Sequence, residues 1–82
     1  MSRRTFSGRE VAKVLVQWGF KPVGGQGSHR VFRYEHPETG EARTVSVPIT
    51  HDPIKTGTLR EIATQAGAEN FEAFCAELDA WL

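Results

Sequence analysis

The chain has 82 residues and no net charge, because ten Lys and Arg balance ten Asp and Glu. This length supports one modest core and is too short for a cofactor-binding fold with two helical layers, so we expect a single small α+β domain over residues 1–82. No apolar run is long enough to span a bilayer and no leader segment is visible, which predicts a soluble cytoplasmic protein without a membrane partner. The single cysteine, Cys75, excludes an intramolecular disulfide and a cysteine-based zinc cluster, and we expect it to fill apolar space.

The first expected element is a helix from Gly8 to Trp18. Ser7 and Glu10 have the spacing of a capping box, in which each side chain accepts a hydrogen bond from the other residue's backbone N–H. Gly19 follows where a left-handed stop residue belongs. The apolar residues Val11, Val14, Leu15 and Trp18 recur at helical spacing. The opposite face of this helix has Arg9, Lys13 and Gln17.

Three short segments have the composition of strands. Residues 20–23 include Pro22, which cannot donate to a hydrogen-bond ladder and therefore suits an edge strand. Residues 30–34 and 42–47 follow, separated by a polar turn in which we expect His36 to be a solvated loop histidine. The short connections predict an antiparallel three-stranded meander.

Two more helices are expected after a connector over residues 49–56. The second helix has Thr58 and Glu61 at capping-box spacing, with Thr56 as a rival cap, and the third begins at about Asn70. All three helices can cover one face of the sheet, which would leave the other face open to solvent as the place for function. The apolar positions of these two helices are Leu59, Ile62, Ala63, Ala66, Phe71, Phe74, Cys75, Leu78, Trp81 and Leu82.

Charge is unevenly distributed along the chain. Residues 1–33 contain seven Lys and Arg and one acid, a net charge of +6, whereas residues 61–82 contain five acids and no base, a net charge of −5. This asymmetry predicts either an electrostatic footprint on one side of the molecule or two ordinary solvated helix faces. The total charge of zero argues against a strongly basic nucleic-acid binder.

A glycine-rich turn over residues 24–28 is followed by one histidine and two arginines at the start of an apolar segment. Glycine allows positive φ and a close approach of the backbone to another molecule. The imidazole of His29 can gain or lose a proton near neutral pH, which suits acid–base chemistry. The same pattern also fits a plain hairpin turn followed by a surface histidine.

Three groups of residues occur together in a specific order. They are Ser7-Gly8-Arg9-Glu10 leading to Trp18-Gly19-Phe20, then Gly27-Ser28-His29, then Val45-Ser46-Val47-Pro48 with Lys55-Thr56-Gly57-Thr58-Leu59-Arg60 and Gln65-Ala66-Gly67. From about Ser7 to Gly67 the chain resembles the HicA toxin family, also described as YcfA-like. The resemblance implies a fold similar to a double-stranded-RNA-binding domain, α-β-β-β-α, here followed by an extra C-terminal helix.

The same resemblance implies the toxin of a type II toxin–antitoxin system, an enzyme that cuts mRNA and is neutralised by a HicB-type antitoxin. It assigns the catalytic role to His29. Family members commonly have proline where this chain has Thr56, which we expect to affect only the start of the helix. The acidic, aromatic segment after Gly67 is longer than the usual family ending, and it either completes the core or forms a partner surface.

The residues around His29 fit this chemistry. RNA is cut without metal when a base takes the 2′-hydroxyl proton, the 2′-oxygen attacks phosphorus and an acid protonates the leaving oxygen. His29 can perform one of these roles, and the guanidinium groups of Arg30 and Arg33 can hold the phosphate. We expect neither a metal site nor a cofactor.

For the remaining candidate residues the sequence leaves more than one role open. Lys21 and Lys55 are further phosphate ligands or plain surface lysines, and Gly27 and Ser28 either contact phosphate or shape the turn. The sequence leaves the second proton-transfer group open among His51, Tyr34 and water. Because His51 is next to Asp52, it also fits a residue that shapes a turn.

Two other functions are consistent with the residue pattern. The first is a noncatalytic RNA-binding module, because folds of this kind bind RNA by shape and backbone contacts. The second is a protein-interaction domain that docks a partner helix on an exposed aromatic stripe near Phe74 and Trp81.

Overall fold

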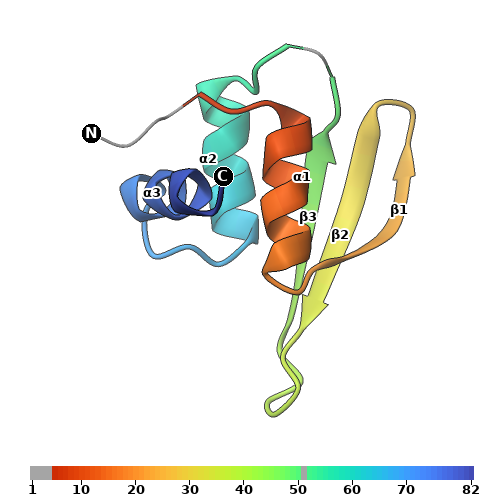
Figure 1. Cartoon of the computed structure of the whole chain (residues 1–82). Helices are drawn as coiled ribbons and strands as arrows, with labels where there is room; N and C mark the ends of the chain where they lie inside the picture. The colour runs from red at the N-terminus through yellow and green to blue at the C-terminus, as the bar shows by residue number, and fades with distance from the viewer. Residues whose placement is uncertain (1–4, 51) are drawn as a thin grey trace.

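The computed structural model describes residues 5–50 and 52–82, and Figure 1 shows its architecture. In the described part of the chain the order is helix, three strands, helix, helix, which confirms the predicted α+β class. The elements are α1 (Gly8–Gln17), β1 (Lys21–Gln26), β2 (His29–Glu35), β3 (Ala42–Pro48), α2 (Thr56–Gln65) and α3 (Phe71–Trp81).

Helix α1 begins at the predicted residue and ends one residue before the predicted end. The Ser7 side chain accepts a hydrogen bond from the Glu10 backbone N–H at 3.2 Å, and the Glu10 carboxylate accepts one from the Ser7 N–H at 3.0 Å. This capping box satisfies two backbone donors that the first helical turn leaves without partners. Trp18 is the C-cap, and Gly19 follows it with a φ of 101°.

The sheet is an antiparallel meander with β2 in the centre. Strand β1 is longer than predicted: it continues through Gly24 and Gly25, which pair with Val31 and Arg30. The predicted strand end at Val23 was wrong because a ladder is made by backbone groups, which glycine supplies like any other residue. Val23 is the extra residue of a β-bulge between Pro22 and Gly24.

The helices form two layers on one side of the sheet. Helices α1 and α2 contact the strands directly, whereas α3 packs against α1 and α2 (Figure 1). The prediction that the helices cover one face is confirmed, with α3 lying outside the first two. An edge-to-face contact between the rings of Trp18 and Phe74, whose centroids are 6.0 Å apart, joins α1 to α3.

One apolar core joins the sheet to all three helices. Helix α3 contributes Phe74, Cys75 and Leu78, so the long C-terminal segment completes the core. Phe74 is only 3% exposed, and the predicted exposed stripe is therefore wrong: of its two residues only Trp81, at 46%, faces solvent. The remaining buried residues are Phe6, Val11, Val14, Leu15, Phe20, Phe32, Val45, Val47, Ile54, Leu59, Ile62 and Ala63.

The two C-terminal helices begin differently. Asn70 caps α3 by accepting a hydrogen bond from the Ala73 N–H at 2.7 Å, as its predicted start requires. The capping box predicted at Thr58 and the rival cap at Thr56 are both wrong, because α2 begins at Thr56, with Lys55 as its N-cap and no side-chain cap. Thr58 therefore lies within the first turn of α2, where its side chain is exposed.

Candidate functional site

The turn between β1 and β2 consists of Gly27 and Ser28, and it places His29 at the first position of β2. Gly27 has a φ of 62° and Gly25 one of 149°, conformations that residues with a side chain rarely adopt. A methyl group on Gly25 would also overlap the carbonyl oxygen of His29. Glycine is therefore required at these two positions for the backbone conformation that places the exposed imidazole of His29.

Side-chain alternation along β2 divides the predicted site residues between two faces. Phe32 is buried under the helices, so Arg30 lies on the helix side with it. His29, Val31 and Arg33 lie on the opposite, open face of the sheet. The structure thus brings Arg33 to the same face as His29 and separates Arg30 from it.

His29 opens into a shallow hollow of about 200 Å³ at the corner where the open face of the sheet meets α2. We call it the His29 hollow. One wall of the hollow belongs to β3, where Pro48 is paired with His29 of β2, and the other belongs to α2. The α2 wall includes a carboxylate, a hydroxyl and an amide. The lining residues are His29, Ser46, Pro48, Thr58, Glu61, Ile62 and Gln65.

The α2 wall is the part of the site that the sequence analysis missed. Thr58, Glu61 and Gln65 share one helix face by their spacing of three and four residues, which the sequence does contain. The sequence does not show that this face lies along the edge of β3, because that placement depends on tertiary packing.

Two cations lie farther along the open face. Lys21 on β1 is directly opposite Arg33 on β2. The two residues border a second small hollow with Glu35, to which the Arg33 guanidinium forms an exposed ion pair at 3.7 Å. Lys55 is exposed at the N-cap of α2, the helix that contributes the second wall of the His29 hollow. Lys21 and Arg33 therefore give the open face positive charge at a distance from His29.

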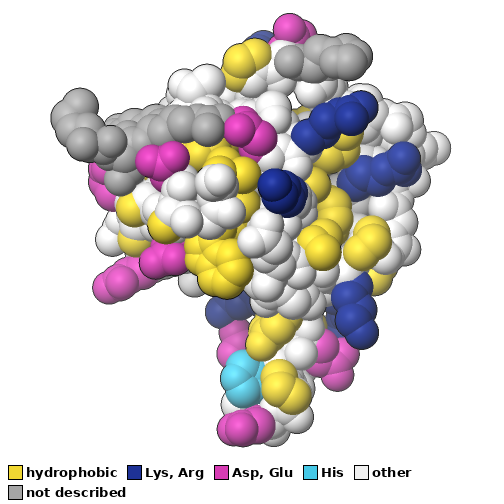
Figure 2. Space-filling view, viewed as in Figure 1, with side chains coloured by type: hydrophobic (Ala, Val, Ile, Leu, Met, Phe, Trp, Pro, Cys, Tyr) yellow, Lys and Arg dark blue, Asp and Glu magenta, His cyan; other side chains and the backbone are white. Residues whose placement is uncertain are grey.

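On the helix side, Arg30 borders a wide groove between α1 and the first two strands, which we call the basic groove. Its floor is apolar and its rim carries Arg9, Lys13 and Arg30. Figure 2 shows this arrangement, with Lys and Arg side chains around exposed apolar surface, and shows Asp and Glu side chains gathered over α3 on the other side. The charge asymmetry of the sequence is therefore also an asymmetry of the molecule. The floor of the groove is formed by Ala12, Val16, Pro22, Phe32 and Ile49.

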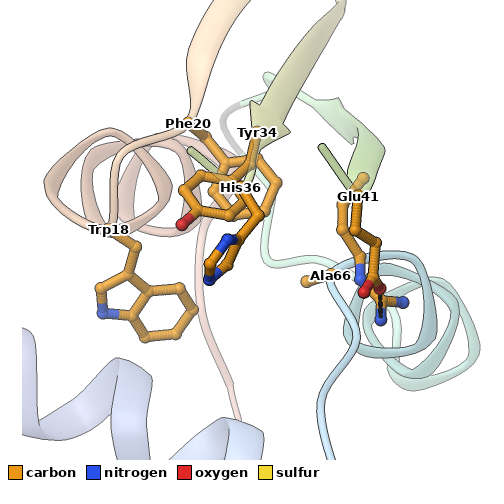
Figure 3. Close-up of a pocket in the computed structure, with 7 residues that line it drawn as sticks. Trp18, Phe20, Tyr34, His36, Glu41 and Ala66 are labelled. Atoms are coloured by element: carbon orange, nitrogen blue, oxygen red, sulfur yellow. Dashed lines mark hydrogen bonds and ion pairs between the residues drawn. The ribbon is translucent and has the colours of Figure 1, made fainter. Parts of the chain in front are cut away.

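An aromatic hollow of about 300 Å³ lies on the helix side at the far end of β2 (Figure 3). The Tyr34 ring packs edge-on to His36, with centroids 6.4 Å apart, and tilted against Phe20 at 5.5 Å. The Nδ1 atom of His36 accepts hydrogen bonds from the Glu38 and Thr39 amides, so this histidine organises the β2–β3 turn. His36 is thus a partly exposed loop histidine, as predicted, and in addition it holds the turn in place.

The three sequence candidates for a second proton-transfer group can now be located. Tyr34 lies in the aromatic hollow, on the face of the sheet opposite His29. His51 lies outside the described residues, as do Arg3 and Arg4. Among residues 5–50 and 52–82, no three His, Cys, Asp or Glu side chains are grouped to hold a metal ion. None of the helices in those ranges has the length and apolar character needed to cross a bilayer.

Most of the chain matches a known protein family. A family model described as the HicA toxin of bacterial toxin–antitoxin systems matches residues 8–68. The matched span runs from α1 through α2 and includes both walls of the His29 hollow, whereas α3 follows it. A search of curated proteins found no match to the chain.

Proposed function

Since the chain belongs to the HicA toxin family of bacterial toxin–antitoxin systems, we propose that it is a metal-independent endoribonuclease that cleaves mRNA in the cytoplasm. A HicB-type antitoxin of the type II class would neutralise it. The observation that carries this proposal is the position of His29, which is exposed at a turn shaped by two positive-φ glycines and opens into a hollow on the uncovered face of the sheet.

The imidazole suits one of the two proton transfers that RNA cleavage requires. An imidazole accepts or donates a proton near neutral pH, and a positioned acid or base accelerates such a step by about 10²–10⁴-fold. The 2′-hydroxyl of RNA supplies the nucleophile, so the reaction does not require a metal ion. DNA lacks that hydroxyl and is expected to resist cleavage.

The RNA backbone is expected to follow the open face of the sheet. Lys21 and Arg33 would neutralise phosphates there, because they lie on the same face as His29. Gly27 and Ser28 form the turn next to the imidazole and allow close approach of the backbone to phosphate. Lys55 would add a charge at the α2 end of the hollow, and Arg30, on the other face, is expected to contribute least.

The experiment that tests this function compares cleavage of a defined single-stranded RNA, in excess chelator, by the unmodified chain and by His29→Ala. We expect the variant to bind RNA with similar affinity and to lose at least about 10²-fold in cleavage rate. The matched control is His36→Asn, whose side-chain oxygen can replace Nδ1 as the acceptor for the turn amides and which should retain activity.

Two results would overturn the proposal. Retained cleavage by folded His29→Ala would remove the catalytic role of the imidazole. RNA binding without cleavage by the unmodified chain would favour a noncatalytic RNA-binding module.

A further inference from the structure

The His29 hollow contains a second ionisable side chain, Glu61, which projects from α2. The other lining residues carry no charge: they are Ser46, Pro48, Thr58, Ile62 and Gln65. No hydrogen bond or ion pair joins the imidazole of His29 to the Glu61 carboxylate in the structure. We propose that Glu61 is the second proton-transfer group of the cleavage reaction and acts with His29 on opposite sides of one phosphate; this inference rests on the ribonuclease function proposed above.

Packing holds Glu61 in this position. Leu59, Ile62 and Ala63 are buried in the core and fix the rotation of α2 about its axis. One helical turn after Glu61, the Gln65 side chain accepts a hydrogen bond from the Ser46 N–H of β3 at 3.0 Å. Residues four apart lie on one helix face, so this bond directs Glu61 toward the strand edge as well.

The strands complete the arrangement from the other side. Pro48 of β3 is paired with His29 of β2, which places the imidazole one strand away from α2 and on the open face. Tyr34 cannot share this site, because it lies on the opposite face at the other end of β2. Glu61 is thus the ionisable group that the described fold places in one hollow with His29.

The pair accounts for both proton transfers. The Glu61 carboxylate takes the proton of the 2′-hydroxyl, the 2′-oxygen forms a bond to phosphorus, and the bond from phosphorus to the 5′-oxygen breaks. The His29 imidazolium gives its proton to that departing 5′-oxygen. The products are a 2′,3′-cyclic phosphate and a 5′-hydroxyl, with Glu61 protonated and His29 neutral until solvent exchanges the protons.

A carboxylate beside a phosphate requires compensating positive charge. The His29 imidazolium supplies it within the hollow, and Lys21 and Arg33 supply it along the same face. Lys55 lies at the N-terminal end of the same helix as Glu61. The Thr58 hydroxyl, also in the hollow, can donate to a phosphate oxygen.

The mechanism predicts a rate that depends on pH in both directions. Cleavage needs an ionised carboxylate and a protonated imidazole, so the rate rises with pH as the carboxylate loses its proton and falls as the imidazolium loses its own. The test is Glu61→Gln, which keeps the shape and removes the base. We expect single-turnover cleavage to fall by about 10²-fold or more and the acidic limb of the pH–rate profile to disappear.

Three comparisons make the result decisive. Glu61→Asp keeps a carboxylate and should retain more activity than Glu61→Gln, and Glu69→Gln, which removes an exposed acid outside the hollow, should leave the rate unchanged. A Glu61→Gln rate within about two-fold of the unmodified chain would overturn the inference, as would a lower rate with both limbs of the profile intact. Absence of cleavage by the unmodified chain would instead overturn the ribonuclease function itself.

Discussion

The backbone N–H of Ser46 donates a 3.0 Å hydrogen bond to the side-chain oxygen of Gln65, joining the outer edge of β3 to α2. A backbone N–H can only donate, so the Gln65 oxygen must face the strand and its amino group must point away. The bond occupies one of the donors that an edge strand leaves unpaired. It also builds the corner in which His29 and Glu61 share a hollow.

Gln65→Leu should destabilise the protein by about 0.5–1.5 kcal/mol, because it leaves the Ser46 N–H without its partner. The matched control is Gln65→Glu, which keeps an oxygen acceptor and should lose less stability than the leucine variant, its own loss coming from the like charge of Glu61 one helical turn away. Denaturant unfolding followed by circular dichroism measures both. Equal stability of the leucine variant and the unmodified chain would show that the bond does not fix α2.

Gly25→Ala should disturb the turn that holds His29, whereas Gly24→Ala should not. Gly25 has a φ of 149° and lies against the His29 carbonyl, while a methyl group on Gly24 would meet no atom within 4 Å. We expect a loss on the order of 1–3 kcal/mol for the first variant and less than about 0.5 kcal/mol for the second. Thermal unfolding tests this pair, and similar effects of the two substitutions would contradict the predicted close approach.

Leu78→Ala tests whether α3 belongs to the core. Leu78 is fully buried, so its truncation should cost about 2–5 kcal/mol, whereas Trp81→Ala at an exposed position should cost less than about 1 kcal/mol. Urea unfolding of both variants gives the comparison. A larger loss for Trp81→Ala would mean that the end of α3 contributes more to stability than its middle.

Lys21 and Arg33 should carry part of the salt dependence of RNA binding. Each phosphate contact with single-stranded RNA contributes about 0.7 to the slope of log affinity against log salt concentration, so Lys21→Ala and Arg33→Ala should each lower the slope by up to that amount. Arg43→Ala is the control, because Arg43 lies opposite Tyr34 and beside the aromatic hollow, on the other face of the sheet from His29. An Arg43 effect as large as those of Lys21 and Arg33 would place the RNA elsewhere.

The sequence predicts those features that depend on neighbouring residues. The capping box of Ser7 and Glu10 involves residues three apart, and it forms as expected. The extent of β1 was missed, because the pairing of Gly24 and Gly25 depends on β2 and glycine side-chain patterns carry no strand signal. The sequence did not distinguish whether the segment after Gly67 belongs to the core or forms a partner surface. Its packing against α1 and α2 shows that it belongs to the core.

The candidate site also has parts that the sequence predicts and parts that depend on tertiary packing. The glycine turn and His29 could be found by inspection, because they are contiguous in sequence. The opposite faces of His29 and Arg30 follow from strand alternation only once both are known to lie in β2. The approach of Glu61, 32 residues after His29 in the chain, comes from tertiary packing, which local patterns do not contain.

The most direct test of the account is the chemical identity of the RNA ends produced by the unmodified chain in excess chelator. Mass spectrometry of a cleaved oligonucleotide should find a 2′,3′-cyclic phosphate on one fragment and a 5′-hydroxyl on the other, and a matched DNA should stay intact. Fragments that end in a 3′-hydroxyl and a 5′-phosphate, or cleavage that stops on chelation, would contradict attack by the 2′-hydroxyl with His29 as the acid.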